Sequence, residues 1–131
     1  MRVIDASALA KYVNREEGWE RVEEHLLKGC VTLDLALKEV ANSLWKRVKR
    51  GELGGGKAVE VVRALLENRI VRISPEQPLL VEALELSIKT GLTIYDSVYI
   101  ALARRLGTEL ITSDRKQAEK AGEAGVIPIL V

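Results

Sequence analysis

Short apolar segments alternate with longer segments of helical periodicity along the chain, and this alternation limits the fold more than any other feature. The short segments are residues 3–4, 30–33, 70–73, 109–112 and 126–130. Between them, apolar residues recur at the three- and four-residue spacing of a helix. Strands that alternate with helices in this way form a mainly parallel sheet covered on both faces. We therefore expect a single α/β domain over residues 1–131, with a five-stranded sheet in a three-layer α/β/α arrangement.

Helices are predicted at residues 8–12, 19–27, 35–50, 57–68, 79–89, 94–106 and 114–121. The helix over 94–106 is almost wholly apolar, so it should lie in the core. A glycine cluster from Gly51 to Gly56 separates two of the helices and is expected to form the turn of a helical hairpin.

Composition excludes several classes of protein. The single cysteine, Cys30, and the single histidine, His25, leave no material for a disulfide, a zinc cluster or a histidine-based triad. The net charge of +1 excludes a grossly basic nucleic-acid binder but not local basic patches. No apolar run approaches the roughly 20 residues of a membrane span, and the N-terminus is too polar for a signal peptide. We expect a cytoplasmic protein without a membrane partner.

Two aspartates stand where chemistry is usually found in an open parallel sheet, at the carboxyl ends of strands. Asp5 follows the first predicted strand and Asp114 follows the fourth, so both side chains could enter one crevice. A plain alternative is that each one caps the helix that follows it. Asp114 with Gln117 even has the spacing of a capping box.

Two further acids occur in helical segments. Asp96 lies in the nearly apolar helix, where a buried carboxylate needs a cation or hydrogen-bond donors, although it could also serve as a cap. Glu39 is placed opposite the apolar residues Leu37, Leu44 and Val48 of its helix, on what could be a solvated face. Glu39 is therefore a candidate active-site residue only in combination with the other three acids.

The four acids, in this order, resemble the PIN-domain nucleases and most closely the VapC-type toxins of toxin–antitoxin pairs. The matching segments are residues 3–8, 39–42, 95–103 and 110–114, which together span nearly the whole chain. The resemblance implies a five-stranded parallel sheet, an endoribonuclease that depends on Mg²⁺ or Mn²⁺, a homodimer and a small VapB-like antitoxin. It also implies that Asp5, Glu39, Asp96 and Asp114 are the catalytic, metal-binding acids, and that Ser7, Asn42 and Thr112 support them.

The residue types suit this chemistry. Mg²⁺ prefers oxygen ligands and keeps several waters, and a bound ion can activate water and polarise a phosphate. Basic residues near the acids would hold the RNA backbone. The candidates are Lys46, Arg47, Lys49 and Arg50 in one helix, and Arg115 and Lys116 directly after Asp114. A solvated helix face is the alternative explanation for these charges.

Three rival functions were weighed. Residues 51–58 nearly spell a P-loop, but they follow a helix rather than a strand, and Ala58 replaces the hydroxyl residue that would bind Mg²⁺. A receiver-like phosphoacceptor domain should have an acid beside Asp5 and a lysine near the last strand, and neither is present. A non-catalytic PIN-like interaction module is the more serious alternative, but such a module could lose the acids, and all four are here.

Overall fold

The computed structural model describes residues 1–131 and contains a five-stranded, all-parallel sheet with strand order β3-β2-β1-β4-β5. The strands are β1 (Arg2–Ile4), β2 (Cys30–Leu33), β3 (Arg72–Ser74), β4 (Leu110–Thr112) and β5 (Pro128–Leu130). The helices are α1 (Ala6–Val13), α2 (Trp19–Leu27), α3 (Asp34–Lys49), α4 (Gly55–Glu67), α5 (Leu80–Thr90), α6 (Ile94–Leu106) and α7 (Arg115–Glu123). A 3₁₀ turn, η1 (Gln77–Leu79), precedes α5.

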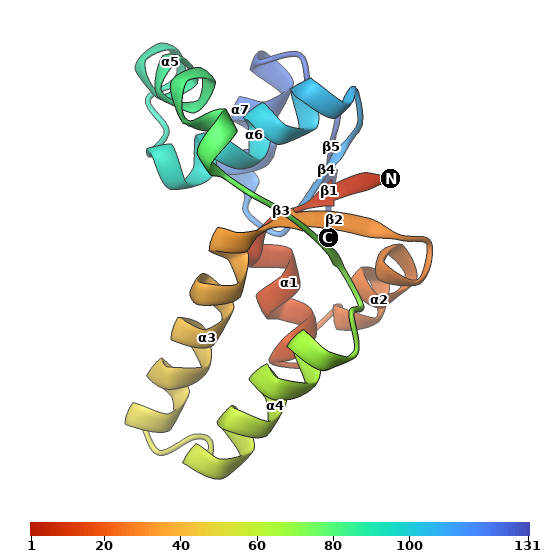
Figure 1. The fold of residues 1–131 in the computed structure, drawn as a ribbon, viewed down its shortest axis with the longest axis vertical. Coiled ribbons are helices and arrows are strands. Elements are labelled where there is room, and N and C mark those ends of the chain that lie inside the picture. The colour runs from red at the N-terminus through yellow and green to blue at the C-terminus, as the bar shows by residue number, and fades with distance from the viewer.

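The helices form two layers, one on each side of the sheet (Figure 1). Helices α1 to α4 lie on one face, and α5, α6 and α7 lie on the other. This division follows from the strand order, because the chain moves outward from β1 to β3, then returns across the sheet to β4 and β5. Right-handed crossovers in opposite directions must place their helices on opposite faces. The expected three-layer α/β fold with a parallel sheet is confirmed.

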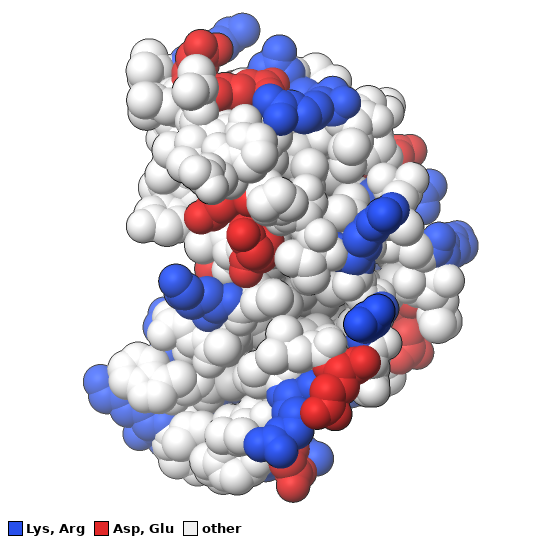
Figure 2. Space-filling model, viewed as in Figure 1, with Lys and Arg blue, Asp and Glu red and all other residues white.

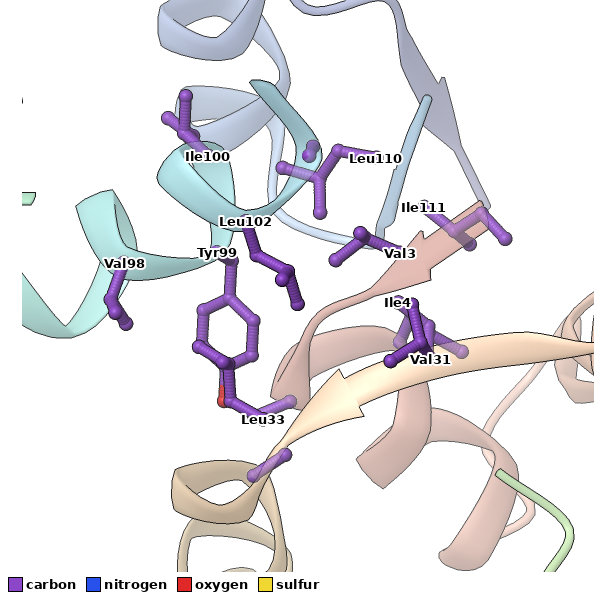
Figure 3. Close-up of a cluster of buried hydrophobic side chains, with 14 of the residues drawn as sticks. Val3, Ile4, Val31, Leu33, Val98, Tyr99, Ile100, Leu102, Leu110 and Ile111 are labelled. Atoms are coloured by element: carbon purple, nitrogen blue, oxygen red, sulfur yellow. The ribbon is translucent and has the colours of Figure 1, made fainter. Parts of the chain in front are cut away.

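The centre of the sheet is the centre of the core. Strand β1 pairs with β4 through Val3 opposite Leu110 and Ile4 opposite Ile111, and all four side chains are fully buried. Helix α6 packs against these two strands, and its Tyr99 ring extends toward Leu33 at the end of β2 (Figure 3). Seven consecutive residues of α6, Ser97 to Ala103, are buried, as its apolar sequence predicts. None of the helices is both long and apolar enough to cross a membrane.

Several expected boundaries differ by one or two residues from those observed, including those at the edges of the sheet and at the glycine cluster. Strands β3 and β5 each begin two residues later than expected. The glycine turn between α3 and α4 is confirmed, with Gly51 at a φ of 75°. Gly55 and Gly56, however, belong to the first turn of α4 rather than to the turn before it. A helix start tolerates glycine because its first N–H groups have no helical partner in any case.

The central pairing should dominate stability. We expect Ile111→Ala to lower the free energy of unfolding by about 2–5 kcal/mol, because a fully buried side chain leaves a cavity. Ile127→Ala is the matched control, since Ile127 is 69% exposed and its removal should change stability by less than about 0.5 kcal/mol. Urea unfolding of both variants measures the difference, and equal losses would contradict this placement of the core.

Candidate active site

Asp5 and Asp114 follow the carboxyl ends of the two central paired strands, β1 and β4, where the order of the chain through the sheet reverses. The Asp5 backbone N–H donates to the Ile111 carbonyl of β4 at 3.0 Å. Both side chains also cap helices, as the alternative explanation held. Oδ1 of Asp5 accepts from the Ala8 N–H at 3.0 Å, and Oδ1 of Asp114 accepts from the N–H groups of Lys116 and Gln117. Capping in each case uses one carboxylate oxygen.

A chain of hydroxyl groups joins the ends of these two strands. The Ser7 hydroxyl donates to Oδ1 of Asp5 at 2.6 Å and lies 3.2 Å from the Thr112 hydroxyl oxygen. Ser7 also accepts from the N–H of Ser113, and Thr112 accepts from the N–H of Asp114 at 3.1 Å. These contacts fix the backbone on both sides of the two acids. Ser7 and Thr112 therefore hold Asp5 and Asp114 in place.

Asp96 is the third residue of α6 and is half-buried beside the same strand ends. Its side chain is not the helix cap, because that position belongs to Thr93. The Gln117 side chain donates from Nε2 to the Asp96 backbone carbonyl at 2.9 Å. This contact replaces the expected capping box, in which Gln117 would turn back to the N–H of Asp114. Gln117 instead joins the first turn of α7 to the first turn of α6.

Glu39 lies closer to the core than its expected position on a solvated face. The buried residues of α3 are Ala36, Val40 and Leu44, whereas Leu37 and Val48 are only half-buried. Glu39 faces α6, where its Oε1 accepts a hydrogen bond from the Tyr99 hydroxyl at 3.3 Å. The sequence reasoning missed Tyr99 as part of this site. Its signal was a phenolic hydroxyl in an otherwise apolar helix, which needs a buried partner.

Burial and mutual repulsion raise the pKa values of three of the acids, Asp5, Glu39 and Asp96. Burial raises the pKa of Asp5 to about 6, against hydrogen bonds from Ser7, Thr112 and Ala8, with a further upward contribution from Asp96. Burial also raises the pKa of Glu39 to about 7, and the charges of Asp96 and Asp5 add to the rise. The pKa of Asp96 is raised by burial and then by Asp114. Asp96 therefore lies at the centre of the group, because its charge acts on Asp5 and Glu39 and the charge of Asp114 acts on it.

The donor set fits a hard divalent cation in chemistry and in charge. None of the four acids forms a salt bridge, and Lys116 is the only basic side chain that measurably lowers the pKa of one of them, Asp96. In this conformation no three of these groups converge closely enough to hold one ion directly. An ion such as Mg²⁺ keeps several of its waters, which can bridge to carboxylates that do not all touch it. Figure 2 shows acidic side chains at the inner wall of a hollow between α3 and the α5–α6 layer.

The remaining expected site residues are more scattered. Asn42 is exposed one turn beyond Glu39, and its side chain forms no hydrogen bond with the acids. Arg115 follows Asp114 directly and is exposed. Lys46 and Arg50 lie about 10 and 16 Å farther along the α3 axis than Glu39, at 1.5 Å per residue.

Several of the α3 charges already have partners near the far end of the helix. Arg50 pairs with Glu52 at 3.2 Å, and Lys49 lies over the Trp45 ring. Lys116, which was expected with Arg115 beside Asp114, lies close enough to Asp96 to lower its pKa. The basic charge nearest the acids thus comes from the start of α7 rather than from α3.

Comparison with known proteins agrees with this geometry. The PIN domain family model matches residues 2–123. Ribonuclease VapC3 of Pyrobaculum aerophilum is 40% identical over 121 residues, which cover 90% of this chain and 92% of that protein. Exonuclease VapC9 of the same organism is 32% identical over 130 residues, covering 98% of this chain and 92% of that protein.

Solved structures show the same fold. The crystal structure of PAE2754 from P. aerophilum superposes with a TM-score of 0.76 at 28% identity, and covers 97% of this chain and 82% of that one. A toxin–antitoxin complex from Klebsiella pneumoniae superposes with a TM-score of 0.66 at 18% identity, and covers 97% and 96%. The family match excludes the receiver-like alternative. This chain belongs to the PIN-domain family of metal-dependent nucleases, and its sequence relatives include a VapC ribonuclease and a VapC exonuclease.

Proposed function

We propose that this chain is a Mg²⁺-dependent endoribonuclease and the toxin of a toxin–antitoxin pair, with Asp5, Glu39, Asp96 and Asp114 as its catalytic acids. One observation carries the proposal. Four carboxylates from four separate segments meet at the reversal of the sheet, with three raised pKa values and no salt bridge. Such a cluster is costly unless something compensates its charge, and clusters of this kind mark functional sites.

The roles of the side chains follow from their contacts. Asp5 and Asp96 are proposed as the main metal ligands, with Asp114 and Glu39 completing the site directly or through water; Mn²⁺ is a substitute. A bound ion lowers the pKa of a water ligand and polarises the scissile phosphate. Ser7 and Thr112 hold the two strand-end acids, and Tyr99 orients Glu39.

The RNA backbone would approach through the hollow beside these acids. Arg115, together with Lys46, Lys49 and Arg50 farther out on α3, is proposed to contact phosphates. Asn42 is exposed on α3 between Glu39 and Lys46 and could support the acids from there. Phosphate contacts of this kind supply affinity with little sequence preference. Cytoplasmic location stays a prediction.

Two surfaces suit the expected protein partners. A groove of about 570 Å³ lies between α3 and α4, and Trp45, Val48, Val59, Val62 and Leu66 are among the apolar residues that line it. We assign this groove to an apolar helix of a VapB-like antitoxin, whose arginine or lysine would then reach the acids. The exposed apolar residues Val81, Leu84 and Ile88 of α5 support a homodimer of single-domain subunits.

The first test is RNA cleavage by variants of the acids. Asp5→Asn and Asp96→Asn should each lower the cleavage rate in Mg²⁺ by more than about a hundredfold, because loss of a direct ligand should exceed the 10–100-fold cost of losing an outer contact. The fold should persist, since asparagine also caps helices well at position 5, and the half-buried Asp96 side chain does not cap α6. The control is Glu119→Gln, which neutralises an exposed acid of α7 outside the cluster.

The choice of substrate distinguishes endonuclease from exonuclease activity. Circular RNA has no ends, so an endonuclease cuts it and an exonuclease does not. We expect cleavage of circular RNA by the parent protein and by Glu119→Gln. Near-normal cleavage by Asp96→Asn would contradict the proposed active site. Activity confined to linear RNA would contradict only the assignment as an endonuclease.

The second test is stability against pH. An acid whose pKa is higher in the folded state binds its proton more tightly there, so its stabilising effect is present at low pH and is lost as pH rises. For Asp5, whose pKa rises from 3.8 to about 6, the full loss is about 3 kcal/mol, and most of it falls between pH 4 and 7. In EDTA, we expect the free energy of unfolding of the parent protein to fall as the pH rises from 4 to 7. The fall should be smaller in Asp5→Asn.

Metal should reverse this loss. At pH 7, Mg²⁺ at a hundred times its dissociation constant should add about 2.7 kcal/mol to the parent protein and to Glu119→Gln. In Asp5→Asn the gain should largely disappear. Equal Mg²⁺-induced shifts in melting temperature for the parent and Asp5→Asn would contradict a shared metal site.

The third test is partner binding. Trp45 is 55% exposed in the α3–α4 groove, so Trp45→Lys should leave the fold intact. It should weaken binding of the protein encoded beside this gene by about thirtyfold, the effect of losing an aromatic hot spot of 2 kcal/mol. Ile127→Lys, at an exposed apolar residue outside the groove, is the control. Unchanged affinity in Trp45→Lys, measured by calorimetry on the purified pair, would place the partner elsewhere.

A further inference from the structure

A second cavity lies away from the acids, on the face of the sheet covered by α1 to α4. Its volume is about 650 Å³, within the range of about 300–1,000 Å³ typical of small-molecule sites. Its walls come from the end of α2, the end of α4 and the edge strand β3, and they are mainly apolar, with Leu26, Leu37, Leu65, Ile70 and Ile73 among them.

The charges around this cavity are all of one sign. Lys28, Arg69 and Arg72 line it, and no aspartate or glutamate does. None of the three cations forms a salt bridge or a side-chain hydrogen bond, although the chain makes six salt bridges elsewhere. An apolar hollow bordered only by unpaired cations is complementary to a molecule that is apolar at one end and negatively charged at the other.

The backbone at Arg69 adds an independent observation. Arg69 follows Asn68, the C-cap of α4, and has a φ of 48° in the left-handed region. Helices that end this way usually place glycine or asparagine at this position, because a longer side chain is strained there. An arginine at this position accepts that strain while it directs a guanidinium to the cavity.

The cavity is separate from the proposed nuclease site. It shares no residue with the four acids, and the segments before β2 and β3 supply much of its wall. The acids instead follow the carboxyl ends of β1 and β4 or lie on α3 and α6. A ligand here would not occupy the site of RNA cleavage.

We propose that this cavity binds an amphipathic anion, a small molecule with an aliphatic or aromatic body and one negatively charged group. The body would lie against Leu26, Leu65 and Ile70, and the anionic group would lie among Lys28, Arg69 and Arg72. Guanidinium groups are well suited to this, because they form paired hydrogen bonds with carboxylate or phosphate. A second copy of the chain is a poor occupant, because it would bring more cations to the same patch.

The test compares three probes with the same aliphatic chain, namely decanoate, decanol and decylammonium, by calorimetry below their aggregation concentrations. We expect saturable binding of decanoate with a dissociation constant at least about tenfold lower than that of either other probe. Amide chemical shifts should move at residues 26–30 and 69–73. Equal binding of all three probes would show nonspecific adsorption, and shifts confined to the α3–α4 groove would show a different site. Either result overturns the proposal.

Variants separate binding from folding. Arg69→Gln with Arg72→Gln should weaken decanoate binding by about tenfold or more, whereas Arg63→Gln, an exposed arginine of α4 outside the cavity, should not. Arg69→Gly should weaken binding while the melting temperature stays the same or rises, because glycine relieves the left-handed strain. Full decanoate affinity in Arg69→Gly and in the double variant overturns the proposal. An absence of decanoate binding also overturns the proposal, and an acidic peptide segment would then be the better candidate for this cavity.

Discussion

The pairing of β1 with β4 is the interaction on which the rest of the molecule depends. These strands are more than a hundred residues apart in sequence, yet Val3 faces Leu110 and Ile4 faces Ile111 at the centre of the sheet. Because the strands are parallel, the pairing places the residues after them at the same edge. Because the chain turns outward in opposite directions from β1 and β4, helices leave that edge on opposite faces and open a crevice between them.

Much of this arrangement could be predicted from the sequence. Helix α6 was predicted with its observed bounds, because a long apolar segment is buried wherever it packs. The positions of Asp5 and Asp114 followed from the ends of two short apolar strands. The edge strands were less well placed, since β3 and β5 are partly exposed and their sequences carry a weaker signal of burial. The local sequence around each acid predicted that it could be functional. Only the topology of the sheet shows that the acids lie close together.

The residues whose positions were predicted wrongly share one cause. The apolar residues of a single helix can face two different surfaces, the core and a groove. Helix α3 packs Ala36, Val40 and Leu44 into the core, while Trp45 and Val48 line the groove against α4. A sequence pattern does not separate these two faces, so the position of Glu39 relative to the core was wrong. The contacts of Gln117 and Tyr99 were missed for a related reason. Each depends on a helix that is distant in sequence and adjacent only in the fold.

The positions of the acids on their helices explain why one of them differs from the rest. Asp5, Asp96 and Asp114 all lie at or within the first turn of a helix, where free N–H groups and the positive end of the helix dipole favour a carboxylate. Glu39 is the sixth residue of α3, and its one hydrogen bond comes from Tyr99. Although it is less buried than Asp5, Glu39 has the higher pKa, about 7 against about 6. When no cation is bound and the pH falls, Glu39 is therefore the first of the acids to take up a proton. Its protonation lowers the repulsion within the cluster, while Asp5, Asp96 and Asp114 stay held at the starts of their helices.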